Sequence, residues 1–284
     1  MGCVVTAHLY LGSDRSLRGC LFSAESFAHP AKLHLGFLRW LGNEYTTPGQ
    51  HVADPMGGVG SAFLLALEQR DVTVLDVEPR WLALAHDNAA RIHRAAGLFA
   101  GRMAVIQHDA RQPWPVRPDV ALFSPPYACR AGTNAATRRS VFNRRAKLLN
   151  SGVLSNRWKE LVVKIDAQPG ALGAELFHYG AHPDQIGHLR SGRYWDAMGE
   201  VYRRAHEALP VGGLMILVIK DHIRDGRRVH VCDETVARVT GLGFDLAARH
   251  ARHLEQLSLW QRRRREQGLL VVEEEEALVF RRAA

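Results

Sequence analysis

The centre of the chain alternates short apolar strands with helical patterns, and this alternation limits the possible folds more than any other feature. We expect four strands here, at His51–Pro55, Val72–Asp76, Met103–Gln107 and Asp119–Phe123. Helical patterns follow the first two strands, at Ala62–Glu68 and from Pro79 onward. Strands separated by helices favour right-handed crossovers and a parallel sheet, so the pattern predicts a doubly wound α/β fold.

The same alternation continues toward the carboxyl end of the 284-residue chain. A helix is expected at Tyr194–Leu209, an apolar strand at Leu214–Ile219 and a further helix at about Cys232–Thr240. Strands are expected from Phe244 onward and at Glu276–Phe280. In an open parallel sheet, ligands bind outside the carboxyl ends of the strands. The functional residues are therefore expected in the loops that follow the central strands.

Composition excludes several classes of protein. The four cysteines (Cys3, Cys20, Cys129 and Cys232) show no paired spacing, so we expect neither a disulfide framework nor a metal site. No apolar stretch is long enough to cross a bilayer, and residues 1–10 lack the pattern of a signal peptide. We therefore expect a cytoplasmic protein without a membrane partner, either a monomer or a homodimer.

Positive charge is concentrated in one segment. The chain has a formal net charge of +8. Eleven basic residues and four acidic ones between Ala128 and Arg193 leave +7 in that stretch. We interpret residues 128–192 as a basic insert in a single domain of residues 1–284, and such charge favours a nucleic-acid partner. A solvated surface loop is the alternative. The residues expected to contact phosphates are Arg130, Arg138, Arg139, Arg144, Arg145 and Lys147.

A glycine-rich loop follows the first of these strands, with the sequence Asp54-Pro55-Met56-Gly57-Gly58-Val59-Gly60. Glycines permit close approach of a ligand to the backbone, although such a loop alone is a weak signal. Acidic residues at the ends of two further strands strengthen the evidence for a ligand site. Asp76 ends the second strand, where a carboxylate can accept hydrogen bonds from both hydroxyls of a ribose. Asp109 follows the third strand and is placed to accept from an adenine amino group.

The chemistry of this loop points to a cationic nucleoside cofactor. The chain lacks the lysine-containing phosphate loop of nucleotide triphosphatases. A nicotinamide cofactor would need a third, regularly spaced glycine to hold its pyrophosphate, and an acid precedes the glycines here instead. S-adenosylmethionine has a sulfonium, an α-ammonium and no phosphate. It is therefore the cofactor that the acidic loop favours.

The fourth strand ends in Ser124-Pro125-Pro126-Tyr127. Two prolines make this turn rigid and donate no N–H groups, so carbonyl oxygens remain as acceptors. The amino group of a nucleobase is a poor nucleophile because its lone pair is delocalised. A serine hydroxyl and a proline carbonyl that accept its two N–H hydrogens would favour a pyramidal nitrogen, while Tyr127 stacks on the base. An ordinary proline turn is the alternative for this tetrapeptide taken alone.

The Ser124–Tyr127 tetrapeptide and the upstream glycine loop resemble those of the amino-group nucleic-acid methyltransferases, which are class I enzymes that use S-adenosylmethionine. The resemblance implies a Rossmann-like, mostly parallel sheet with an antiparallel last strand. The Ser-Pro-Pro-Tyr form is associated with cytosine N4 in DNA, whereas related forms are associated with adenine N6 and guanine N2. His29-Pro30-Ala31-Lys32 resembles the family's cofactor-proximal motif. Met56 and Val59 replace the aromatic residue and the serine that the family usually has.

These observations define a candidate site. The residues expected to bind cofactor are Pro30, Lys32, Asp54, Pro55, Gly57, Gly58, Gly60, Asp76, Val77, Asp109, Ala110 and Ser124. The residues expected to act in catalysis are Ser124, Pro125, Pro126 and Tyr127. The leading hypothesis is methylation of DNA at cytosine N4. The alternatives are amino-group methylation of a base in tRNA or rRNA, since a separate target-recognition domain is lacking, and a catalytically silent module that binds cofactor and nucleic acid.

Overall fold

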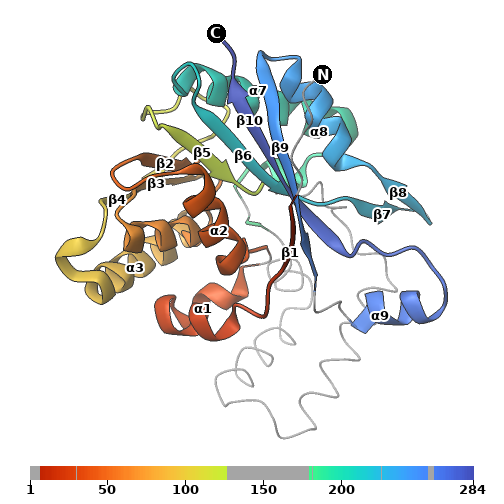
Figure 1. Cartoon of the computed structure of the whole chain (residues 1–284), viewed down its shortest axis with the longest axis horizontal. Coiled ribbons are helices and arrows are strands. Elements are labelled where there is room, and N and C mark those ends of the chain that lie inside the picture. The colour runs from red at the N-terminus through yellow and green to blue at the C-terminus, as the bar shows by residue number, and fades with distance from the viewer. Residues whose placement is uncertain (1–6, 30, 127–178, 181, 225, 255–258) are drawn as a thin grey trace, which may run out of the picture.

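An eight-stranded mixed sheet organises the protein in the computed structural model (Figure 1). The structure describes residues 7–29, 31–126, 179–180, 182–224, 226–254 and 259–284. The strand order is β1-β9-β10-β6-β5-β2-β3-β4. The strands are β1 (His8–Tyr10), β2 (His51–Asp54), β3 (Asp71–Asp76), β4 (Met103–Gln107), β5 (Val120–Phe123), β6 (Leu214–Ile219), β9 (Phe244–His253) and β10 (Glu274–Arg282).

Five neighbouring strands, β4, β3, β2, β5 and β6, run parallel. Their central members are buried on both sides, and every residue of β5 and β6 is buried. This is why they appear in the sequence as continuous apolar runs without polar alternation. The polar residues that end β2 and β3, Asp54 and Asp76, consequently lie at one edge of the sheet.

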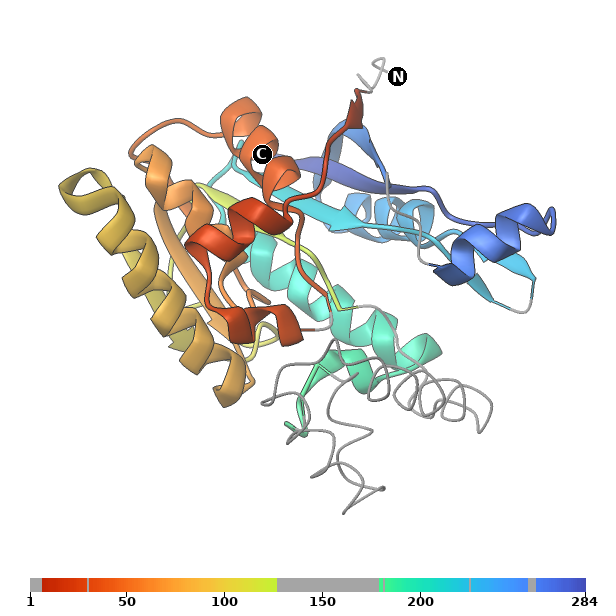
Figure 2. The ribbon, with the colours of Figure 1, turned by 90° about the horizontal axis from the view of Figure 1, so that it is seen from below.

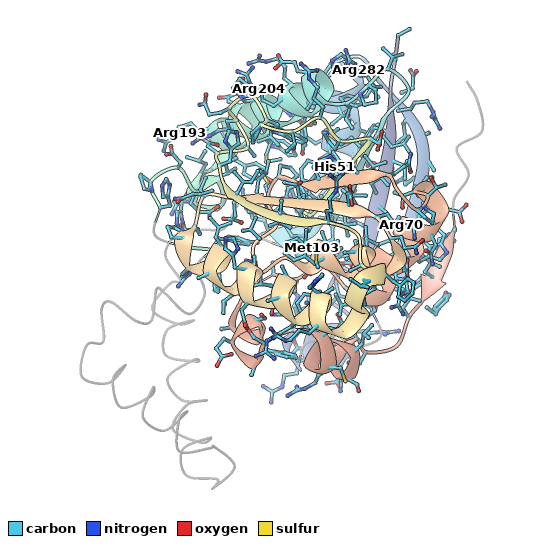
Figure 3. The ribbon with its side chains drawn as sticks, turned by 90° about the vertical axis from the view of Figure 1, so that its left-hand side faces the viewer. His51, Arg70, Met103, Arg193, Arg204 and Arg282 are labelled. Atoms are coloured by element: carbon cyan, nitrogen blue, oxygen red, sulfur yellow. The ribbon has the colours of Figure 1, made fainter. Side chains whose placement is uncertain are left out.

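Helices cover both faces of the sheet (Figure 3). One face packs against α1 (Arg15–Leu21), α2 (Leu35–Tyr45), the 3-10 helix η2 (Ser61–Glu68) and α3 (Pro79–Ala96), and the other against α7 (Ser191–Ala208) and α8 (Val231–Thr240). Figure 3 looks onto the β4 edge, where Met103 lies, with α3 on one side of the sheet and α7, which contains Arg204, on the other. Each face of the sheet carries one cluster of buried apolar side chains, and the two clusters together form the hydrophobic core.

The last strand, β10, confirms the expected antiparallel arrangement. It runs antiparallel to both β6 and β9, with a register shift between Val279 and Phe280 on the β9 side. Its acidic residues face basic partners. Arg249 pairs with Glu276, and Arg252 contacts Glu275 at 2.6 Å. Glu273 lies 3.2 Å from Arg265 and Glu274 lies 3.1 Å from His253, so each acid of the run has a basic neighbour.

Several elements differ from the sequence prediction. The segment after the glycine loop, predicted as an ordinary apolar helix at Ala62–Glu68, forms the 3-10 helix η2 instead. Gly60 and Gln69 flank it in the left-handed conformation, and Ser61 to Ala66 are buried, so tertiary packing determines its shape. Sequence patterns also missed β1, α1, α2, the short hairpin described below and four 3-10 or peripheral elements. These are η1 (Ala24–Ala28), η3 (Gly97–Phe99), η4 (Ile186–His188) and α9 (Leu259–Glu266).

A small antiparallel hairpin, β7 (His222–Arg224) with β8 (Arg227–Val229), follows β6. Figure 2 shows this hairpin at the opposite end of the molecule from α3. Within the described residues, no helix has the length and hydropathy needed to cross a membrane.

Candidate active site

A pocket opens at the carboxyl ends of β2, β3 and β5, and the space around it that no protein atom fills, open solvent included, is about 790 Å³. It unites residues that are far apart in the sequence, from His29 to Ile186. The predicted residues that line it are Lys32, Asp54, Pro55, Gly57, Asp76, Val77, Asp109, Ala110, Ser124 and Pro126. Tyr127, Pro30 and the basic residues Arg130, Arg138, Arg139, Arg144, Arg145 and Lys147 lie outside the described residues.

The glycine loop is shaped mainly by contact with protein. A Cβ on Gly57 would lie 2.4 Å from a methyl carbon of Val74, and one on Gly58 would lie 2.7 Å from Nε2 of His29. Gly58 and Gly60 both have positive φ and do not line the pocket. That Gly58 and Gly60 contact a bound cofactor stays a prediction, and the structure shows what each glycine meets within the protein. Gly57 lets the loop fold tightly against β3, Gly58 against His29 and Gly60 against Phe63.

Asp76 fixes this loop while facing the pocket. Its Oδ2 accepts the N–H of Gly58 at 2.9 Å, and its Oδ1 accepts the N–H of Glu78 at 2.9 Å. Each carboxylate oxygen can accept a second hydrogen bond. Burial raises the pKa of Asp76 to about 6, against the lowering effect of those two backbone N–H groups. The carboxylate thus retains acceptor capacity at the end of β3.

Asp54 is a second buried acid in the same pocket. Its side chain is almost inaccessible, and its Oδ1 accepts the N–H of Met56 at 3.0 Å. Burial, together with the nearby charge of Asp76, raises its pKa to about 7. Two carboxyl groups with raised pKa values favour any ligand that brings positive charge into the pocket, since a cation stabilises their ionised forms.

Asp109 is already engaged within the protein. The guanidinium of Arg111 donates to both of its carboxylate oxygens, with Nη2–Oδ2 at 2.8 Å. Burial would raise the pKa of Asp109, but the hydrogen bonds and charge of Arg111 hold it below its usual range. The sequence suggested that Asp109 accepts from an adenine amino group. In the structure much of its acceptor capacity serves Arg111 instead.

His108 supplies an unsatisfied polar atom that sequence reasoning overlooked. Its Nε2 is buried on the pocket wall and has no hydrogen-bond partner among the described residues. A buried unpaired ring nitrogen carries an energetic cost of about 1–3 kcal/mol unless a ligand or water satisfies it. This atom is therefore an available contact for a polar group of a bound ligand.

A short segment that lies far along the chain from the glycine loop also lines the pocket. We call residues 179–180 and 182–189 the clasp. Buried Glu78 accepts the backbone N–H of His182 at 2.8 Å, and the indole N–H of Trp81 donates to the carbonyl of Tyr179. Asp184 contacts Arg111 at 2.7 Å. The clasp thus connects the elements after β3 and β4 to the carboxyl-terminal part of the basic insert.

The amino-terminal wall is held by buried polar side chains. Arg18 donates to the carbonyl of Leu33 at 2.7 Å and to Ser61 at 3.2 Å, which connects α1 to the start of η2. Asn88 of α3 donates to the carbonyl of Val59 at 2.7 Å and accepts the N–H of Ser23. These contacts hold Leu33, Val59 and Ser61 on the wall of the pocket. No sequence motif marks Arg18 or Asn88, because their partners are distant in the chain.

His29 and Lys32 line that wall. Burial lowers the pKa of His29 to about 4, so its ring is neutral near pH 7 and packs edge-on against Trp81 at 4.6 Å between centroids. Lys32 donates to the carbonyl of Phe27 at 3.1 Å and to that of His29 at 2.5 Å. Burial and the charge of Arg18 lower the pKa of Lys32. Lys32 therefore stabilises this wall through hydrogen bonds to backbone carbonyls.

Comparison with solved structures identifies the fold. The chain aligns over 96% of its length with 95% of a methyltransferase from Pyrococcus furiosus, with a TM-score of 0.50 and 10% identity. It is also similar to TrmN from Thermus thermophilus (TM-score 0.46, 18% identity, 90% of this chain and 51% of that one). A methyltransferase from Methanosarcina mazei aligns with a TM-score of 0.47 and 13% identity, over 85% of this chain and 96% of that one. The chain thus spans about half the length of TrmN.

No protein-family model matches the chain, and no curated protein matches it. The strand order, the antiparallel β10 and the likeness to the Pyrococcus furiosus protein establish a Rossmann-like class I methyltransferase fold. The predicted fold class is confirmed.

Proposed function

We propose that this protein is a methyltransferase that uses S-adenosylmethionine and acts on the exocyclic amino group of a nucleic-acid base. One observation carries the proposal. Ser124 and Pro126, from the tetrapeptide after β5, line the same pocket as the two acids that end β2 and β3. A group that donates methyl and a group that receives it must occupy adjoining space, and this pocket offers both subsites.

The residues of the pocket fit the cofactor. Asp76 has acceptor capacity for the hydroxyls of a ribose at the end of β3, and Val77 beside it offers an apolar surface to an adenine ring. His108 offers its unpaired Nε2 to a polar atom of the same ligand. Asp54 and Asp76 favour its positive charge. S-adenosylmethionine, when bound, supplies an activated methyl group on a sulfonium sulfur.

Ser124 and the adjacent prolines act on the base amino group that receives the methyl group. The Ser124 hydroxyl and the carbonyl of Pro125 accept the two N–H hydrogens of the base amino group, which favours a pyramidal nitrogen with its lone pair directed at the methyl carbon. Pro125 and Pro126 are buried, so the turn that presents these acceptors is rigid. Preorganised acceptors of this kind stabilise the charge that develops on the nitrogen as it is alkylated.

DNA cytosine N4 is the substrate we favour, because the tetrapeptide has the Ser-Pro-Pro-Tyr form. A base in structured RNA is the second candidate. The net +7 between Ala128 and Arg193 serves either, since phosphate contacts position a nucleic acid without reading its sequence. In both cases the target base must be unpaired or flipped out of a helix to reach Ser124.

A methyl-transfer assay tests the proposal. The full chain is incubated with radiolabelled S-adenosylmethionine and, in separate reactions, duplex DNA, single-stranded DNA and folded RNA, and the products are identified by nucleoside mass spectrometry. We expect N4-methylcytosine from DNA in the wild type and loss of turnover in Ser124→Ala. An amino-methylated base found only in RNA would favour the second candidate. Cofactor binding without transfer to any nucleic acid would indicate a silent module, and 5-methylcytosine would contradict the amino-group assignment.

A further inference from the structure

Three potential metal ligands lie together on the outer part of the sheet, away from the pocket. His8 on β1, His253 on β9 and Glu274 on β10 each offer one ligand atom, and these atoms lie within 4.8 Å of one another. Strands β10 and β6 separate β9 from β5, which reaches the pocket. The cluster is therefore independent of the proposed catalytic site.

Strand register places the three side chains on one face. His253 is directly opposite Tyr10 on β1 and directly opposite Glu274 on β10, and His8 is two residues before Tyr10. Directly paired residues in a sheet project to the same face, and so do residues two apart in one strand. Three neighbouring strands thus present a histidine, a histidine and a glutamate side by side. Figure 1 shows β1 running alongside β9.

The separations between these groups suit a tetrahedral ion. Nδ1 of His253 lies 3.1 Å from Oε1 of Glu274, and ligand atoms at about 2.0–2.1 Å from a tetrahedral zinc are about 3.3 Å apart. The rings of His8 and His253 have centroids 5.7 Å apart, close to the roughly 5 Å expected for two imidazoles on one such ion. Tyr10 stacks on His253 at 4.1 Å and fixes the plane of that ring.

We propose that His8, His253 and Glu274 form a zinc site that joins β1 to β9 and β10, with water as the fourth ligand. Two imidazoles and one carboxylate are a ligand set that zinc prefers. The side chains of His253 and Glu274 are 26% and 33% exposed, so the ion can enter from solvent without unfolding. β1 has only three residues, and the ion would add an attachment to its backbone pairing with β9.

Zinc titration of the chelator-treated full chain tests this site. By isothermal calorimetry we expect one Zn²⁺ per chain in the wild type. His253→Ala and His8→Ala should each weaken that binding by at least the ~10–100-fold that loss of an outer partner of a metal site costs. Glu274→Gln, which keeps the size of the side chain, should act in the same direction. His93→Ala, an exposed histidine of α3, is the matched control and should leave the affinity unchanged.

Two further readouts separate a defined site from nonspecific binding to surface histidines. Co²⁺ in place of Zn²⁺ should give the visible absorption of a tetrahedral complex in the wild type and the control only. Zinc should also slow hydrogen exchange at the N–H of Ala251, which donates to the carbonyl of Ala7 at 2.8 Å. Wild-type zinc binding no tighter than that of the His8→Ala, His253→Ala double variant would refute the site. So would unchanged exchange at Ala251.

Discussion

Asp54 illustrates how a buried acid makes stability depend on pH. Its folded pKa is about 7, whereas an exposed aspartate titrates near 3.9. The folded state therefore binds more protons than the unfolded state between these values. The contribution of Asp54 to stability is fully present below about pH 4 and is lost as pH rises through about 7. Asp76, with a pKa of about 6, acts in the same direction.

We predict that Asp54→Asn removes part of this dependence. The amide keeps an oxygen that can accept the N–H of Met56 but carries no charge at any pH. Relative to the wild type, the variant should gain stability as pH rises from 5 to 8. Urea unfolding of both proteins at the two pH values measures this. A stability difference that does not vary with pH would show that Asp54 ionises normally.

Asp76→Ala tests the assignment of the ribose subsite. We expect the free energy of S-adenosylmethionine binding to weaken by about 1–3 kcal/mol, the cost of losing a charge-assisted acceptor. Calorimetry measures the affinity. Because Asp76 also holds Gly58, Asp76→Asn serves as a second variant that keeps one acceptor oxygen. Unchanged affinity in both variants would place the ribose elsewhere.

The clasp forms one wall of the pocket, where Tyr179, Gln185 and Ile186 line it. A Cβ on Gly180 would lie 1.7 Å from Cδ of Glu78, whose carboxylate accepts the N–H of His182. We predict that Gly180→Ala displaces the clasp and weakens cofactor binding about tenfold, equivalent to 1.4 kcal/mol. Calorimetry measures this change.

Gly199→Ala is the control for that experiment. Gly199 lies within α7 and a Cβ there would meet nothing within 4 Å. This change should leave cofactor affinity unaltered and raise stability by up to about 1 kcal/mol through helix propensity. Equal cofactor affinity in Gly180→Ala and the wild type would show that the clasp does not influence the pocket.

Helices and strands could be predicted where their own residues determine them, and were missed where distant parts of the chain do. Leu214–Ile219 and Met103–Gln107 were predicted with their observed bounds, because buried parallel strands need continuous apolar runs. The three residues of β1 carry no such signal, since pairing with β9 creates the strand. η2 was predicted as a helix but not as a 3-10 helix, because close packing determines its geometry.

The residues of the candidate site divide in the same way, into those that the sequence marks and those that only the fold brings together. Strand ends are visible in the sequence, and the structure brings Asp54, Asp76 and Ser124 into one pocket. The partnership of Asp109 with Arg111 was missed, although the two are only two residues apart, because spacing does not reveal which acceptor a guanidinium selects. Contacts such as Glu78 with His182 join residues 104 apart and need the fold to be seen.

The basic insert, residues 128–192, is the part of the chain that we expect to contact nucleic acid. We predict that reversing Arg138, Arg139, Arg144 and Arg145 to Glu weakens binding to all nucleic-acid sequences alike and flattens the salt dependence of affinity, as loss of phosphate contacts requires. Fluorescence anisotropy across a salt series, with duplex DNA, single-stranded DNA and folded RNA, measures both effects. An unchanged salt slope in the quadruple variant would locate the docking surface elsewhere.

The position of β10 between β6 and β9 governs when the sheet can be completed during synthesis. β9 reaches the sheet only by pairing with β10, which is made later, and β1 pairs with β9 in turn. The strands from β2 to β6 can assemble as soon as they are made, but β1 and β9 must wait for residues 274–282. At roughly 5–20 residues per second, the 55 residues from Ile219 to Glu274 take about 3–11 s. A nascent chain therefore passes through a stage in which β1 and β9 cannot yet be joined to the rest of the sheet, which is complete only when β10 has been made.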